Sequence, residues 1–131
     1  MKKFSNLSLI ALMISIFTIC SCSKTKQEKI ENSWRLIRVK IDSTVNWYES
    51  WKFENNMVHM LKENTISNSM DTLYTAKYTV DAGLSKTIVS FEECEEPSYN
   101  GNWEIIKLNK EILVMLNKPD GNFVYREFVK E

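Results

Sequence analysis

Apolar and polar residues alternate in short runs along most of the chain, and turn-forming residues separate these runs. In one run, for example, Tyr74, Ala76 and Tyr78 fall on the same face of an extended strand. No segment keeps the sustained apolar spacing of an amphipathic helix. The pattern therefore predicts a nearly all-β domain with eight strands, over Trp34–Ile41, Trp47–Glu54, Met57–Lys62, Leu73–Val80, Ser85–Phe91, Trp103–Leu108, Ile112–Asn117 and Phe123–Val129.

Most connections between the predicted strands are short and have turn chemistry. Asn55-Asn56 offers two residues that tolerate positive φ, and Asp81-Ala82-Gly83 and Pro119-Asp120-Gly121-Asn122 are typical of tight turns. Consecutive strands with short connections form an antiparallel meander, and closure into a barrel removes its exposed edges. We therefore expect an eight-stranded antiparallel up-and-down barrel.

The first residues have the pattern of an export signal. Lys2 and Lys3 precede an apolar stretch from about Leu7 to Ile19. This stretch of ~13 residues is shorter than the ~20 that a helix needs to cross a membrane. The signal is therefore expected to be removed, and it takes no part in the fold.

The run Ile19-Cys20-Ser21-Cys22 resembles the processing site of a bacterial lipoprotein. In such sites an apolar residue stands three positions before the cysteine that receives the lipid, and a small residue stands directly before it. Cys22 fits as the lipid acceptor, whereas Cys20 would place Ile19 where a small residue is needed. The alternative is an ordinary secretory signal cut after Ser21 or Ser23.

These signals divide the chain into a lipoprotein signal peptide (1–21), a lipidated tether (22–29) and one barrel domain (30–131). The tether is polar and rich in lysine, and a single helical turn anchored by Ile30 is expected near its end. By resemblance to Gram-negative sorting, the absence of Asp after Cys22 implies the outer membrane. Lys24 and Lys26 do not match the acidic signals for surface export, which favours the periplasmic face over the cell surface.

Motifs spread over residues 30–129 resemble the small lipocalin-like lipoproteins of Bacteroidota. Ile30-x-Asn32-x-Trp34-x-Leu36 stands where that family usually has Leu-x-Gly-x-Trp-x-Leu, and Asn replaces the glycine. The other matching motifs are Phe53 before a short polar turn, Tyr78-x-Val80, and Trp103-x-Ile105-x-x-Leu108. The resemblance implies a lipocalin-like barrel that in some members holds a small apolar cavity, and it implies that Trp34 is a structural plug at the closed end.

The large aromatic residues are the candidates for a ligand site. We expect Trp51, Phe53, Tyr78, Trp103 and Tyr125 to line any cavity in the barrel, with the tyrosine hydroxyls holding the polar end of a ligand. The alternative is plain packing, because an eight-stranded barrel is only just wide enough for its own side chains or one small ligand.

Charge and cysteine usage exclude several function classes. Removal of Lys2 and Lys3 with the signal leaves 15 basic and 17 acidic residues, and no basic stripe suited to nucleic acid. Cys94 would be the only remaining thiol, so no internal disulfide is expected. It lies among four glutamates, which raise a thiol pKa, and we expect it to be inert.

The sequence shows no catalytic or metal-binding motif. His59, the only histidine, has no ligand or nucleophile partner at a recognisable spacing, and the acidic run Glu92–Glu96 lacks the pattern of a calcium loop. We therefore expect a monomer that is not an enzyme and that needs no metal or cofactor. Two hypotheses remain: an envelope lipoprotein that binds a small apolar ligand, or a lipoprotein with a filled barrel. The second would recognise another envelope protein, toxin or hydrolase through Glu63–Asp71 and Glu92–Gly101.

Overall fold

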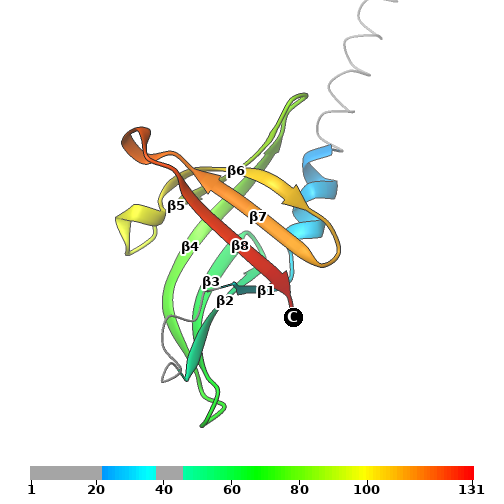
Figure 1. Cartoon of the computed structure of the whole chain (residues 1–131). Helices are drawn as coiled ribbons and strands as arrows, with labels where there is room; N and C mark the ends of the chain where they lie inside the picture. Colours follow the sequence, from blue (N-terminus) through cyan, green and yellow to red (C-terminus); the bar gives the residue numbers. More distant parts are fainter. Residues whose placement is uncertain (1–21, 38–45) are drawn as a thin grey trace, which may run out of the picture.

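The computed structural model describes residues 22–37 and 46–131. Eight strands pair with their neighbours in sequence, all antiparallel, and β8 pairs with β1 to close a barrel (Figure 1). The strands are β1 (Ser33–Leu36), β2 (Trp47–Glu54), β3 (Met57–Asn64), β4 (Met70–Ala82), β5 (Thr87–Glu92), β6 (Gly101–Leu108), β7 (Ile112–Asn117) and β8 (Val124–Lys130). Two short 3₁₀ turns, η1 (Pro97–Tyr99) and η2 (Pro119–Gly121), precede β6 and β8. The predicted closed eight-stranded antiparallel barrel is confirmed.

The strand boundaries differ from the predicted ones mainly in β3 and β4. The polar segment Glu63–Asp71, expected to be a loop, is strand at both ends, and only residues 65–69 connect β3 to β4. The connection is held by Asn64, whose backbone N–H donates to the Ser69 carbonyl at 2.9 Å and whose side-chain oxygen accepts from the N–H groups of Ile66 and Ser67. The first strand, predicted over Trp34–Ile41, ends at Leu36 as β1, since Ile37 is not part of a strand; residues 38–41 lie outside the described residues.

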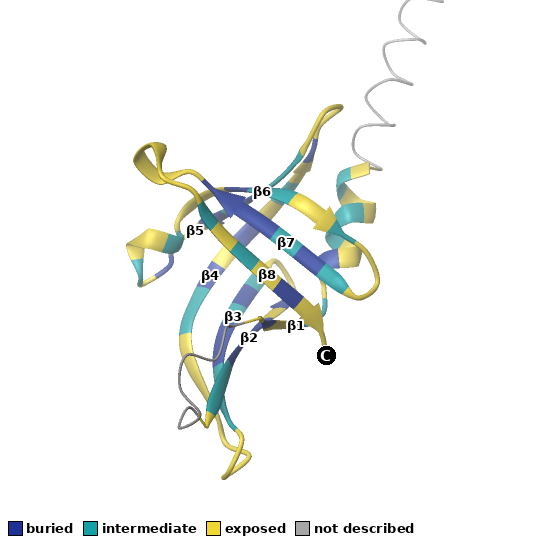
Figure 2. Ribbon diagram, in the orientation of Figure 1, coloured by how far each residue is buried: buried dark blue, intermediate teal, exposed yellow. Residues whose placement is uncertain are grey.

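Buried residues alternate with more exposed ones along much of the barrel strands (Figure 2), and large side chains fill the interior. Most inward positions are apolar, and the most deeply buried large residues include Trp34, Trp51, Trp103, Tyr78, Phe53, Phe91 and Phe128. The outward positions are exposed or half-buried, apart from a few buried ones such as Ser50. This hydrophobic interior is the dominant stabilising contribution to the fold.

One end of the barrel is closed by a helix over residues 22–30. Ile30 at its last turn is fully buried, and the Trp34 indole N–H donates to the Ile30 carbonyl at 2.9 Å. Earlier in the helix, the Ser23 hydroxyl accepts from the Ala82 N–H at 2.9 Å, and the Gln27 side chain donates to that of Asn56. Trp34 thus occupies the closed end, as the resemblance implied.

The tether predicted over 22–29 is wrong in its conformation. Its polar composition suggested a segment with nothing to pack against, but the segment is helical from residue 22 and hydrogen-bonds to the β4 and β2–β3 ends of the barrel. Polar side chains support such docking because they satisfy backbone groups at the strand ends. Among the residues that the structure describes, no helix is long and apolar enough to cross a membrane.

Asn55 and Asn56 form the β2–β3 turn with φ values of 50° and 61°, as expected for a tight hairpin. Replacing Asn55 by Ala is predicted to destabilise the domain by about 1–2 kcal/mol, because a left-handed backbone is unfavourable for a residue with a Cβ and no local hydrogen-bonding group. Asn55→Gly should be close to neutral. Denaturant midpoints of the two variants test this, and equal midpoints would contradict it.

Candidate functional site

Four of the five predicted ligand-lining residues lie together inside the barrel. Trp51, Phe53, Tyr78 and Trp103 are each no more than 2 % exposed. Their rings contact one another, with centroid distances of 6.4 Å for Trp51–Phe53, 6.2 Å for Trp51–Trp103 and 5.2 Å for Phe53–Tyr78. The four side chains fill the part of the interior where a cavity was expected. We call Trp51, Phe53, Tyr78 and Trp103 the aromatic floor.

Tyr125 is not part of this group, and its expected position in the interior is wrong. It is 60 % exposed and pairs with Leu116 of β7 on the outer face. Its neighbours in sequence, Val124 and Arg126, occupy the inward positions together with fully buried Phe128. The apolar Phe128 sets the register of β8, and alternation then turns Tyr125 outward.

The Tyr78 hydroxyl points toward the closed end of the barrel. It lies 3.5 Å from a carboxylate oxygen of Glu31, which directly follows the N-terminal helix. Burial, followed by the charge of Glu31, raises the pKa of the Tyr78 phenol well above its usual value. The hydroxyl is thus engaged by the closing segment and is not directed at the opposite end.

Polar side chains take over the inward positions at the other end of the barrel, which we call the open end. Glu49 precedes Trp51 by two residues on β2, Arg126 pairs with buried Met115, and Asn117 pairs with Val124. Tyr74 on β4 and Tyr99 in η1 complete the group. We refer to Glu49, Tyr74, Tyr99, Asn117 and Arg126 as the open-end cluster.

Contacts tie the open-end cluster to the aromatic floor. The Trp51 indole N–H donates to Glu49 Oε1 at 2.7 Å, and the Tyr99 ring lies edge-on to Trp51 with the centroids 5.5 Å apart. Tyr99 also contacts Tyr74, at 5.9 Å between centroids, and the Arg126 guanidinium lies 5.8 Å from the Tyr99 ring centroid. The cluster therefore combines the Glu49 carboxyl group, the Arg126 guanidinium and the aromatic faces of Tyr74 and Tyr99 within one small region.

The pKa of the Tyr99 phenol is raised by its buried and charged surroundings. Burial raises the pKa of its phenol first, the charge of Glu49 raises it further, and the charge of Arg126 lowers it. Tyr99 therefore remains neutral near neutral pH and can donate or accept a hydrogen bond.

Arg126 carries a buried donor without a partner. Its Nε is inaccessible to solvent and makes no hydrogen bond within residues 22–37 and 46–131, whereas the side chain as a whole is only half-buried. Buried donors are normally paired, so an unpaired one is an informative exception. In the described part of the chain it is the only buried side-chain nitrogen or oxygen in this state.

Tyr99 is held in place by the β5–β6 connection. Asn100 accepts from the Cys94 N–H at 2.9 Å and donates back to the Cys94 carbonyl at 3.1 Å, and the Trp103 indole N–H donates to the Tyr99 carbonyl at 2.9 Å. Cys94 itself is buried, and burial is the largest cause of its raised thiol pKa. A backbone hydrogen bond from Glu96 lowers this pKa, and the charges of Glu95 and Glu96 raise it. The direction predicted from the glutamates is confirmed, although burial outweighs them.

The acidic residues of that connection have separate partners. Glu93 forms an ion pair with Lys77 at 2.7 Å, and Glu95 accepts from the Thr75 N–H at 3.0 Å, which lowers the pKa of the Glu95 carboxyl. His59 lies 3.7 Å from Glu54 on the outer surface. The described residues contain no cluster of His, Cys, Asp and Glu that could hold a metal ion.

Two open surface grooves are present, and one of them shares Asn117 with the open-end cluster. One of about 550 Å³ lies at the closed end, between the helix-to-β1 segment and the β2 terminus, and it includes Phe53 in its lining. The other, of about 460 Å³, crosses β5, β6 and β7 and includes Asn117 and two lysines, Lys86 and Lys118. Both are shallow, and we assign no ligand to either.

No protein-family model, no curated protein and no solved structure matches this chain. The open-end cluster was not predicted from the sequence, in which the large aromatic residues gave the stronger signal. A signal was present: Glu49 falls between Trp47 and Trp51, and Arg126 between Val124 and Phe128, at apolar inward spacing. A charged residue on an otherwise apolar face marks either a strand end or a site.

Proposed function

We propose that this protein is a lipoprotein of the bacterial envelope whose lipocalin-like barrel binds a small amphipathic molecule at its open end. The lipid on Cys22 anchors it to the outer membrane, with the periplasmic face favoured. The observation that carries the binding proposal is the open-end cluster, a set of polar and charged side chains on inward positions directly above an aromatic floor.

A barrel that served only as a packed scaffold would not need these residues. Glu49 is 4 % exposed and the Nε of Arg126 is buried, and burial of charged groups is unfavourable unless they are well paired. Half-buried Tyr74 and Tyr99 add aromatic faces with polar tips. Apolar walls with a few converging polar groups are typical of small-molecule sites, and mouths of barrels are a common place for them.

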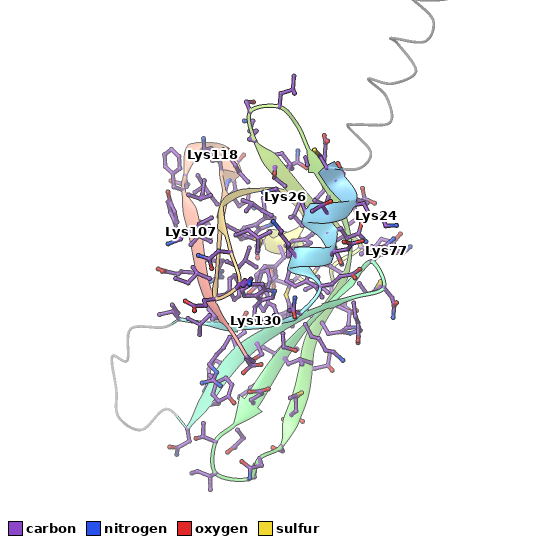
Figure 3. All side chains as sticks on the ribbon, turned by 90° about the vertical axis from the view of Figure 1, so that its right-hand side faces the viewer. Lys24, Lys26, Lys77, Lys107, Lys118 and Lys130 are labelled. Atoms are coloured by element: carbon purple, nitrogen blue, oxygen red, sulfur yellow. The ribbon has the colours of Figure 1, made fainter. Side chains whose placement is uncertain are left out.

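The N-terminal helix supports a particular orientation of the anchored protein. The described part of the helix covers residues 22–30, and Ser23 is hydrogen-bonded to β4. A lipid on Cys22 would therefore leave the molecule at the closed end, and the open end would face away from the membrane. The β4–β5 hairpin beside the helix carries fully exposed Leu84, and Lys24 and Lys26 lie on the helix itself, a combination suited to a lipid surface (Figure 3).

A second function has its own observation. Four of the five aromatic residues expected to line a cavity are instead packed against one another. This favours a filled-barrel lipoprotein that recognises another envelope protein, a toxin or a hydrolase through the loops of the open end, which include exposed Ile66.

Native mass spectrometry of the protein isolated gently from its envelope tests both functions. We expect a chain that starts at Cys22 with added acyl mass, and a second, dissociable small molecule in equal amount. A chain that starts at Cys22 or Lys24 without added acyl mass would contradict the anchor. A lipidated chain with no bound molecule, together with co-purification of one protein in fixed ratio, would favour the filled-barrel function.

A further inference from the structure

The unpaired donor of Arg126 indicates what kind of group the open end accepts. Arg126 lies on the inward face of β8, two residues before fully buried Phe128, and its guanidinium lies over the Tyr99 ring. Its Nε is buried and has no acceptor among the described residues. An acceptor that entered from the open end would satisfy this donor.

We infer that the open-end cluster binds an amphipathic carboxylate, whose carboxylate oxygens accept hydrogen bonds from Arg126. This inference rests on the proposed function and specifies its ligand. The planar guanidinium matches the two oxygens of a carboxylate, and charge assistance strengthens both bonds. The apolar part of the ligand lies against Tyr74 and Tyr99, because their rings are the half-buried surfaces beside the guanidinium.

Glu49 limits the ligand to one negative charge. Glu49 is held by the 2.7 Å hydrogen bond from the Trp51 indole. The charges of Glu49 and Arg126 both shift the pKa of Tyr99, which places both groups close to the Tyr99 hydroxyl. A second carboxylate on the ligand would therefore meet a nearby buried acid, and like charges at short range are unfavourable. Lys62 lies opposite Glu49 in the register of β2 and β3, and its ammonium lies 4.9 Å from the Trp47 ring centroid.

The carboxyl group of Glu49 in the same cluster does not make a cationic ligand the better candidate. Glu49 already accepts the Trp51 N–H. The group that lacks a partner in the described residues is a donor, Arg126 Nε, and a cation offers it no acceptor. An unpaired buried donor costs more free energy than an acceptor that already has a hydrogen bond. The ligand is therefore expected to carry an acceptor for Arg126 and not a cation for Glu49.

The test compares ligands that differ only in their polar group. A soluble form that begins at Ser23 is titrated at pH 7.5 with decanoate, decanol and methyl decanoate, and with 3-phenylpropionate and 3-phenylpropanol, and tryptophan emission is recorded. Each acid is expected to bind about tenfold or more tightly than its alcohol, in line with a charge-assisted bidentate contact. The two ligand series distinguish an alkyl from an aromatic source of the carboxylate.

Variants assign the preference to the named residues. Arg126→Gln should remove the preference for acid over alcohol, Arg126→Lys should keep only part of it, and Glu49→Gln should strengthen acid binding. Arg35→Gln is the matched control, since Arg35 is exposed and its Nε donates to Glu131 at 3.1 Å on the outer surface. It should leave all titrations unchanged, and circular dichroism should show that every variant is folded.

The outcomes separate this inference from the proposed function. Equal affinity of acid and alcohol, or an acid preference that persists in Arg126→Gln, overturns the carboxylate inference and leaves a binding barrel. Flat titrations with every probe overturn both. If Arg126→Gln does not fold, the comparison of acid with alcohol in the parent protein and in Arg126→Lys decides the matter.

Discussion

Replacing Trp34 by Ala is expected to lower the free energy of unfolding by about 3–5 kcal/mol, the range for removal of a large buried aromatic side chain. Trp34 is fully buried, and its indole N–H donates to the Ile30 carbonyl at 2.9 Å. The substitution therefore opens a cavity and also detaches the end of the N-terminal helix from β1. The loss is a large part of the stability of a small domain, typically about 5–15 kcal/mol.

Two matched variants make this measurement specific. Trp34→Phe keeps most of the buried apolar surface and removes the hydrogen bond, so a loss of about 1–2 kcal/mol is expected. Tyr125→Ala changes an aromatic residue that is 60 % exposed, and it should cost about 0.5 kcal/mol or less. Denaturant midpoints of the soluble form compare all three. A loss below about 1 kcal/mol for Trp34→Ala would contradict its role as the plug of the closed end.

Cys22→Ala is expected to move the protein from the membrane fraction to the soluble fraction, or to leave it as an unprocessed precursor. The reason is that the lipid supplies the anchorage in the proposed function. Each buried methylene contributes about 0.8 kcal/mol, so two or three acyl chains hold a protein far more firmly than a single chain. Fractionation of cells that express the parent and the variant, followed by immunoblotting, measures the change.

Cys20→Ala is the control for the choice of cysteine. It changes the neighbouring cysteine in the same run, and it should leave the protein in the membrane fraction. If Cys20→Ala is released while Cys22→Ala behaves like the parent, lipidation occurs at Cys20 and our assignment is wrong. Release of neither variant would mean that another part of the molecule holds the membrane.

The strands and turns of this protein could be predicted from local sequence. β2 and β7 lie where alternation placed them, and the Asn55-Asn56 turn has the positive φ values that the residue types favour. The reason is that side-chain period and turn preference are properties of neighbouring residues. β4 is longer than predicted, because pairing with β3 continues through polar residues that have no period of their own.

The face of each strand was harder to predict from sequence. Tyr125 is more apolar than Arg126, so the sequence favoured Tyr125 as the inward residue, yet the structure places Arg126 inside. A period of two defines two faces but does not say which one meets the core. On β8 the burial of Phe128 settles this, and it does so through contacts with other strands.

The sequence by itself determined the strand order and the tight turns, because these follow from alternation and turn chemistry. The burial of Trp34 was expected only from the resemblance to lipocalin-like lipoproteins, and the structure places this residue in the core. Only the tertiary structure decided that the N-terminal helix docks on the closed end and that Glu49, Tyr99 and Arg126 converge at the open end. These three residues come from β2, η1 and β8. Barrel closure between β1 and β8 and the fold of the β5–β6 connection bring them together, and no local pattern encodes that long-range register.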